Sequence, residues 1–110
     1  MKLALVNCGR ANSVCTGAAC LQAMNERSKN FECYKGQDIT LCALMRCNGC
    51  GNTVEKDAGM QEKLERIISM KPDVAHFGKC TFEKDKMCDT MEDFRTRLEA
   101  AGIKTVLGTH

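Results

Sequence analysis

The sequence predicts a single α/β domain in which helices cover both faces of a four-stranded, mostly parallel sheet, as in flavodoxin-like proteins. Four short apolar segments have the length and composition of buried strands. Segments of helical periodicity alternate with them, and this alternation is typical of right-handed strand–helix–strand crossovers. The 110 residues fit one domain, and no repeat, low-complexity tract or linker divides residues 1–110.

The N-terminal part of the chain predicts one strand followed by one helix. Residues 2–7 form a short apolar run that ends at turn-prone residues, as a buried strand does. Residues 14–27 are mostly good helix formers, and Asn12 or Ser13 can cap the start of this helix. Residues 28–38 are polar and predict a turn-rich connection.

The middle of the chain predicts a second strand and the clearest helix. Residues 39–45 form an apolar run, which predicts a strand buried on both faces. Asn52 and Glu55 resemble a capping box at the start of the helix, and Pro72 marks its end. The apolar side chains of this helix recur at the spacing of one helical face: Met60, Leu64, Ile67 and Ile68.

The C-terminal part predicts a third strand, a third helix and a fourth strand. Residues 74–77 are apolar, and a charged loop follows them. Thr90 and Asp93 have the spacing of a helix N-terminus, and Gly102 marks the end of that helix. Residues 103–107 predict the last strand. The apolar stripe of the third helix consists of Met91, Phe94, Leu98 and Ala101.

This topology predicts that cysteines distant in the sequence meet at one place. The carboxyl ends of parallel strands lie on one edge of the sheet, and ligands bind in the crevice there. Cys8 follows the first predicted strand, Cys80 follows the third and His110 follows the fourth. Cys47 and Cys50 follow the second strand. We therefore expect a cysteine-lined site at the C-terminal edge of the sheet.

The motif Cys47-Asn48-Gly49-Cys50 places two cysteines two residues apart, so both sulfurs can face one centre. This spacing serves zinc sites, iron–sulfur sites and dithiol redox sites. Thiolates crowded at one edge repel one another, and a soft cation compensates their charge. We therefore expect a metal site with four ligands: Cys8, Cys47, Cys50 and Cys80.

The metal is either zinc or the iron of an iron–sulfur cluster, since four cysteines suit both. Closed zinc sites usually use two Cys-x-x-Cys pairs, whereas this chain has one such pair and several dispersed cysteines. That difference slightly favours a cluster. The weaker ligand candidates are Cys15, Cys20, Cys88 and His110. His76 lies within an apolar strand and is expected to be a core histidine.

A thiol oxidoreductase without metal is the alternative function. One sulfur of the Cys47/Cys50 pair would attack a disulfide and the other would resolve it, with Arg46 lowering a thiol pKa. A thioredoxin-type pair opens a helix directly, whereas here Gly51 and Asn52 intervene before the predicted helix. A third possible function is that of a carrier or sensor whose metal serves a redox partner protein.

Composition excludes two classes of partner. The formal net charge of +2 comes from 16 basic and 14 acidic residues without long blocks, and the chain has no Trp, one Tyr and four Phe. Nucleic acid is therefore not an expected ligand. No apolar run approaches the roughly 18 to 20 residues of a membrane span, and the apolar run at residues 3–6 is too short for a secretory signal. We therefore expect a cytoplasmic location, where the nine cysteines are unlikely to form a disulfide framework and, being odd in number, cannot all pair within the chain.

The chain resembles the CGGC-domain proteins over essentially its whole length. The motif at residues 47–50 is similar to the one that names the family, with Asn48 where the family usually has Gly. Asn tolerates positive φ better than other non-Gly residues, so a tight loop can persist there. The resemblance implies metal binding, whereas Cys33 and Cys42 fall outside the family pattern. The other matching segments are Cys8, the cysteine-rich segment 15–27, residues 76–80, Cys88 and residues 108–110.

Overall fold

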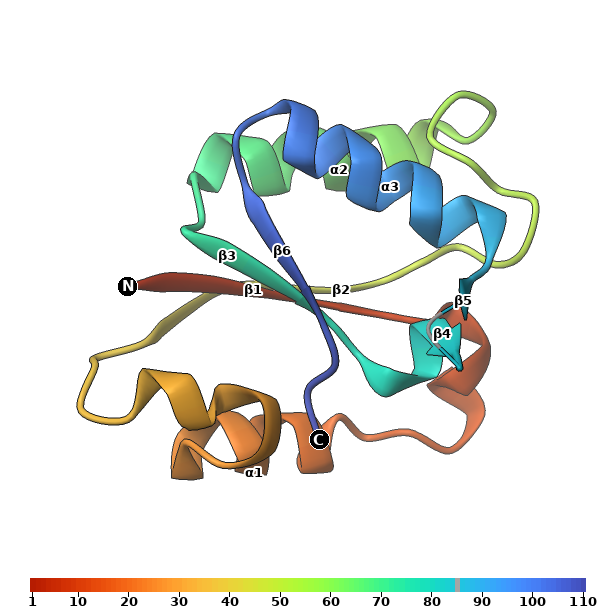
Figure 1. The fold of residues 1–110 in the computed structure, drawn as a ribbon. Helices are drawn as coiled ribbons and strands as arrows, with labels where there is room; N and C mark the ends of the chain where they lie inside the picture. Colours follow the sequence, from red (N-terminus) through yellow and green to blue (C-terminus); the bar gives the residue numbers. More distant parts are fainter. Residues whose placement is uncertain (85) are drawn as a thin grey trace.

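The computed structural model describes residues 1–84 and 86–110 (Figure 1). Three α-helices and six strands are present in these residues, together with three short 3-10 helices. The strands are β1 (Lys2–Asn7), β2 (Thr40–Arg46), β3 (Val74–Phe77), β4 (Phe82–Glu83), β5 (Lys86–Met87) and β6 (Lys104–Leu107). The α-helices are α1 (Ala18–Glu26), α2 (Ala58–Met70) and α3 (Asp89–Ala100), and the 3-10 helices are η1 (Gly9–Ser13), η2 (Lys29–Tyr34) and η3 (Lys79–Thr81).

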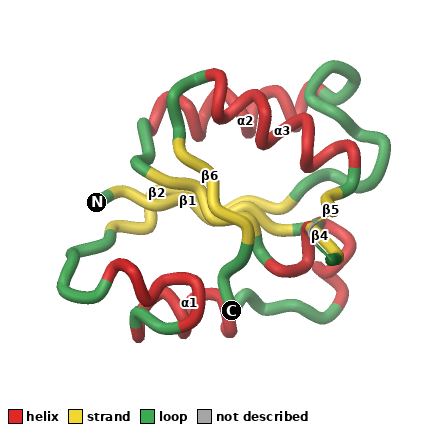
Figure 2. The backbone as a smooth tube through the Cα atoms, in the orientation of Figure 1, coloured by secondary structure: helices red, strands yellow, loops and turns green. Residues whose placement is uncertain are grey.

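The main sheet has four strands in the order β2-β1-β3-β6, and every pairing in it is parallel. Figures 1 and 2 show α1 below this sheet and α2 and α3 above it, which confirms the predicted α/β fold with helices on both faces. The order agrees with the first four strands of a flavodoxin-like sheet. Beyond this order, the flavodoxin-like assignment stays a prediction.

Two apolar clusters hold the layers together, one on each face of the sheet. Alternate residues of β1 point to opposite faces, so Leu3 and Leu5 pack towards α1 while Ala4 and Val6 pack towards α2 and α3. All four side chains are fully buried. Full burial of both faces explains why the short apolar runs of β1 and β3 predict their bounds correctly.

The prediction that the second strand is buried on both faces is wrong. β2 lies at an edge of the sheet, and most of its residues are only partly buried. Leu44 is 50% exposed. An apolar run indicates a strand but does not distinguish a central position from an edge, and here β1 occupies the centre.

The first helix begins later than predicted. η1 precedes it, and Gly17 is the N-cap of α1 with φ of 79°, in the left-handed region that favours glycine. The turn-rich connection at residues 28–38 also contains η2, whose Phe31 and Tyr34 are buried against the sheet. These two aromatic side chains stabilise a segment whose other residues are polar.

The start of the second helix was also predicted wrongly. Asp57 is the N-cap of α2, and its carboxylate accepts hydrogen bonds from Gly59 N at 2.8 Å and Met60 N at 3.3 Å. Asn52 belongs to the preceding loop, where its Nδ2 donates to Asn48 O at 2.6 Å. The predicted apolar face is correct in its main members, because Met60, Leu64 and Ile67 are buried.

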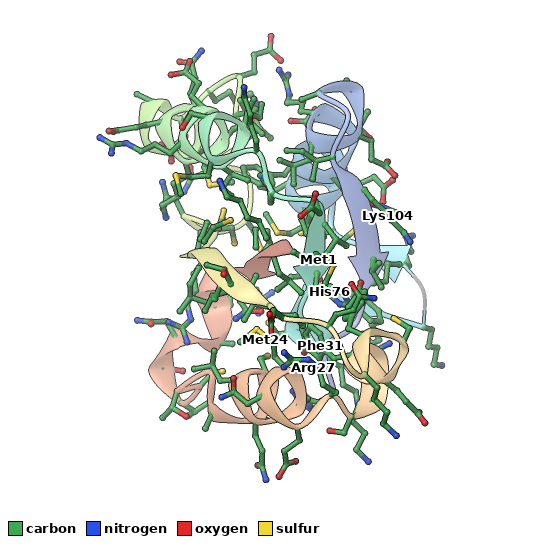
Figure 3. All side chains as sticks on the ribbon, turned by 90° about the vertical axis from the view of Figure 1, so that its left-hand side faces the viewer. Met1, Met24, Arg27, Phe31, His76 and Lys104 are labelled. Atoms are coloured by element: carbon green, nitrogen blue, oxygen red, sulfur yellow. The ribbon has the colours of Figure 1, made fainter. Side chains whose placement is uncertain are left out.

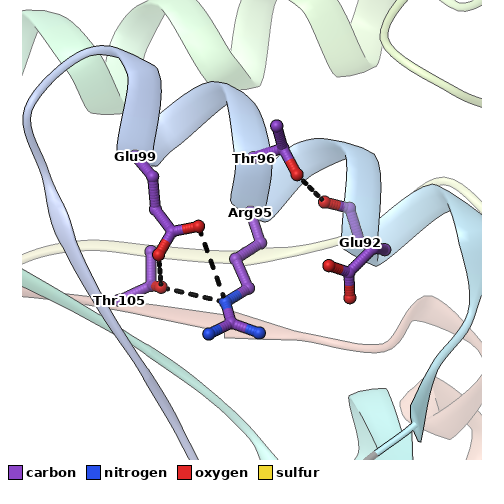
Figure 4. Close-up of polar contacts among 5 residues, drawn as sticks. All are labelled: Glu92, Arg95, Thr96, Glu99 and Thr105. Atoms are coloured by element: carbon purple, nitrogen blue, oxygen red, sulfur yellow. Dashed lines mark hydrogen bonds and ion pairs between the residues drawn. The ribbon is translucent and has the colours of Figure 1, made fainter.

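The third helix begins at Asp89 after Cys88, so Thr90 and Asp93 lie inside α3 rather than at its cap. Side chains tie this helix to β6, as Figure 4 shows. Arg95 Nε donates to Thr105 Oγ1 at 3.0 Å, and the Thr105 hydroxyl donates to Glu99 at 3.0 Å. Ala101, predicted in the apolar stripe, is exposed beyond the end of the helix.

The charged loop predicted after the third strand contains additional structure. η3, β4 and β5 follow β3, and β4 pairs with β5 in an antiparallel two-stranded sheet. This small hairpin lies beside the C-terminal end of β1 (Figure 1). Within the described residues, no helix combines the length and apolarity that crossing a bilayer requires.

Candidate functional site

The C-terminal edge of the sheet brings Cys8, Cys47 and Cys80 together, as the topology predicts. Each residue follows a different strand, and backbone N–H groups contact two of the sulfurs. Cys8 N lies 3.1 Å from Cys80 Sγ, and Gly9 N lies 3.1 Å from Cys47 Sγ. These contacts join three segments that are far apart in the sequence.

The strand ladders continue into this edge and fix its backbone. Cys47 N donates to Asn7 O at 3.0 Å, and Gly78 N donates to Val6 O at 2.8 Å. Gly9 has no space for a side chain, because a Cβ atom there would overlap the carbonyl oxygen of Cys47. Glycine therefore permits the close approach that places Gly9 N beside the Cys47 sulfur.

A cleft of about 720 Å³ opens at this edge, beside the β4–β5 hairpin. Its lining includes four cysteines. Glu83 is the only acidic residue among the described residues that line it. Arg10 Nη1 lies 3.9 Å from Cys50 Sγ. Basic side chains therefore outnumber acidic ones among the described residues that line the cleft. The cysteines of the cleft are Cys8, Cys50, Cys80 and Cys88, and the basic residues are Arg10, Lys79, Lys84 and Lys86.

The two cysteines of the Cys-x-x-Cys motif have different environments. Cys47 is buried and packs in the apolar cluster on the α2 and α3 side, whereas Cys50 is exposed. Neither lies at a helix N-terminus, because α2 begins only at Ala58. The helix dipole therefore does not activate this pair as it activates thioredoxin-type dithiols.

Cys80 is exposed, but protein atoms around its sulfur desolvate the thiolate and raise the pKa of Cys80. Negative charge on Cys8, Cys20 or Cys15 would raise this pKa further. Cys20 is buried, and its Sγ lies 3.1 Å from Thr109 Oγ1.

The pKa of Cys15 is shifted in the opposite direction, to a lower value. Its sulfur accepts a hydrogen bond from Gly17 N at 3.3 Å, and this bond together with the Arg46 side chain lowers the pKa of Cys15. Arg46 Nη2 also donates to Cys15 O at 3.0 Å, which holds the guanidinium group beside this loop. Cys15 is half-buried and therefore accessible to reagents.

We predict that Cys15 is alkylated by iodoacetamide faster than Cys80 at pH 7, because the pKa of Cys15 is lowered and that of Cys80 is raised. The rate for Cys15 should reach a plateau at lower pH than the rate for Cys80. Mass spectrometry of peptides from time-resolved labelling measures both rates. Arg46→Met should slow the labelling of Cys15 and leave that of Cys80 unchanged; equal effects on both cysteines would contradict the assignment.

In the described residues, no three His, Cys, Asp or Glu side chains converge on a point where a metal ion could be held. The sulfurs of Cys47 and Cys80 face backbone N–H groups instead of a common centre. The donor set itself fits a soft metal, because it consists of thiols at one edge with basic neighbours. Binding would therefore require thiol side chains to rotate.

The two histidines lie away from the cleft. His76 is fully buried, as expected of a core histidine: its ring stacks on Phe31, and both nitrogens have partners (Figure 3). Nδ1 donates to Gly108 O at 2.8 Å, and Nε2 lies 2.8 Å from Tyr34 Oη. His110 is exposed and lines a different cleft, beside α1.

Sequence reasoning missed three contributors to this edge: Arg10, the lysines of the cleft and Asn7. Arg10 comes from η1 and Lys79 from η3, whereas Lys84 and Lys86 come from the β4–β5 hairpin, in a segment predicted as a loop. Asn7 is buried beside the cysteines, and it appeared in the sequence only as a turn-prone strand end. A polar amide at the end of a fully apolar strand is the signal that could have identified it.

Comparison with known proteins gives the family. Residues 2–110 match the model of the CGGC domain. The chain belongs to the CGGC-domain family. An uncharacterized protein of Methanocaldococcus jannaschii is 29% identical to this chain over 123 residues, and the match covers 100% of this chain and 87% of that protein. No solved structure matches. Membership in this cysteine-rich family suggests metal binding without identifying the metal.

Proposed function

We propose that this CGGC-domain protein binds an iron–sulfur cluster or Zn²⁺ through cysteine thiolates at the C-terminal edge of its sheet. The proposed ligands are Cys8, Cys47, Cys50 and Cys80. The observation that carries the proposal is the convergence of three strand ends at one edge, with two sulfurs held beside backbone N–H groups. A bound cluster would supply electron transfer or redox sensing, whereas zinc would supply a structural or Lewis-acid centre.

Hydrogen-bond donors and a positive charge surround the sulfurs. Backbone N–H groups lie beside the sulfurs of Cys47 and Cys80, and the Arg10 guanidinium group lies near the sulfur of Cys50. Hydrogen bonds of this kind tune the reduction potential of iron–sulfur clusters. The preference for a cluster over zinc remains slight and rests on the single Cys-x-x-Cys pair.

The dithiol alternative has one observation in its favour. Cys50 is exposed beside Arg10, while Cys47 is buried and held by Gly9 N, which suits an attacking and a resolving thiol. Attack by Cys50 on a substrate disulfide would release one substrate thiolate. Attack by Cys47 on the mixed disulfide would then release the other and leave a Cys47–Cys50 disulfide.

Metal analysis of protein purified without oxygen tests the proposal. We expect stoichiometric iron and sulfide with a visible absorption band, or stoichiometric zinc without colour. Cys50→Ser and Cys80→Ser should each lose most of the metal, because each removes a ligand. Cys33→Ser is the matched control, since Cys33 is an exposed cysteine on η2 outside the cleft. Folded, metal-free protein that reduces a disulfide substrate would instead establish the dithiol function.

A further inference from the structure

The side chain of Asn7 is a buried amide at the end of β1. The residue is 1% exposed, and neither Oδ1 nor Nδ2 has a hydrogen-bond partner among the described residues. An unsatisfied buried amide destabilises the folded state, and natural proteins contain few of them. A leucine of similar size would fill the same space without that penalty. Packing alone therefore does not explain why an asparagine occupies this position.

The position of Asn7 points to the cysteines. It is the last residue of β1, directly before Cys8 and opposite the end of β3. A Cβ atom on Gly78 would overlap Asn7 Oδ1 and would also lie 3.4 Å from Cys80 Sγ. The Asn7 amide and the Cys80 sulfur therefore both lie next to Gly78, which has no side chain to displace either of them. The Cys80 sulfur has Cys8 N as one hydrogen-bond donor, at 3.1 Å, and a thiolate accepts more than one.

We propose that Asn7 is a positioning residue: its amide, turned so that Nδ2 takes the place that Oδ1 now has beside Gly78, donates a hydrogen bond to the sulfur of Cys80 when that sulfur ligates the metal. Ligation makes the sulfur a stronger acceptor, and the donor that is unpartnered in this conformation would then be satisfied. Outer hydrogen bonds of this kind orient metal ligands. The inference rests on the proposed metal-binding function and adds to it a residue that holds no metal itself.

Asn7→Leu tests the inference, with Zn²⁺ as the probe. We expect Zn²⁺ affinity to fall about 10- to 100-fold, as is typical when an outer partner of a ligand is removed. The thermal midpoint of the metal-free variant should equal or exceed that of wild type, because an unsatisfied amide is gone. Asn25→Leu, an exposed change on α1, is the control and should leave the affinity unchanged.

NMR of the ¹⁵N-labelled wild-type protein provides a readout that needs no variant to fold. Zinc should shift the Nδ2 amide resonances of Asn7 and slow their hydrogen exchange, whereas those of Asn25 should change little. Wild type that binds zinc without these changes, or Asn7→Leu with unaltered affinity, would overturn the role of Asn7 while the metal-binding function stands. Wild type that binds neither zinc nor a cluster would overturn both.

Discussion

Replacing His76 with alanine should reduce the free energy of unfolding by about 3–5 kcal/mol, the range for truncating a large buried ring. The substitution removes the stacking on Phe31, whose ring centroid lies 4.4 Å away, and leaves Tyr34 Oη and Gly108 O without partners. Burial raises the pKa of Tyr34 to about 12, so its hydroxyl keeps its proton and donates to His76 Nε2. Chemical denaturation measures the loss.

Tyr34→Phe is the control, because it deletes one hydrogen bond and keeps the packing; we expect a loss of about 1 kcal/mol. A loss as large as that of His76→Ala would show that the histidine ring contributes little beyond this one bond.

The same histidine should make stability depend on pH. Burial lowers the pKa of His76, with Lys104 adding to the shift and the bond to Gly108 opposing it. His76 therefore binds a proton in the unfolded chain as the pH falls below about 6.5, and in the folded protein only at a lower pH. Stability should be full above that pH and decline below it. His76→Ala should lack this part of the decline, and an unchanged pH dependence would contradict the assignment.

Gly9→Ala should be the most damaging conservative change at the cysteine-lined edge. The added methyl group would overlap the backbone carbonyl of Cys47, and backbone cannot move aside as a flexible side chain can. We expect a loss of about 1–3 kcal/mol in unfolding free energy, as in other overpacked sites. The shift should also separate Gly9 N from Cys47 Sγ, so the proposed metal site should weaken. Denaturation curves and zinc titration measure the two effects.

Gly59→Ala is the matched control for this prediction. Its Cβ would meet Asn48 Nδ2 at 2.8 Å, but this atom is the end of a side chain that can turn away. Alanine also favours the first turn of α2. We expect little or no loss of stability in this variant. Equal losses in both variants would show that the Cys47 carbonyl is not the source of the effect.

The sequence predicts the central strands of the fold best. β1 and β3 have the predicted bounds, because strands buried on both faces must be short, apolar and bounded by turns. β2 shows the limit of this reasoning, since an apolar run does not specify the number of neighbouring strands. The cap of α2 shows another limit: Asn52 and Asp57 are both good caps, and tertiary packing decides between them.

The candidate site was predictable to the level of strand ends. Topology alone brings Cys8, Cys47 and Cys80 to one edge, whereas the direction of each sulfur depends on side-chain rotamers and nearby N–H groups. The burial of the Asn7 side chain and the contribution of the β4–β5 hairpin depend on packing that no local pattern records.

The central place of β1 determines when the cysteine-lined edge can exist during synthesis. β1 is made early, but its neighbour β3 spans Val74–Phe77, so the ribosome must add most of the chain before Cys80 can reach Cys8. Until then Cys47 and Cys50 are close through their local spacing, and pairing of β1 with β2 can bring Cys47 to the end of β1. Loading of the proposed site should therefore follow folding, and a nascent chain should hold metal only weakly. Metal content would then report how much of a protein preparation has matured.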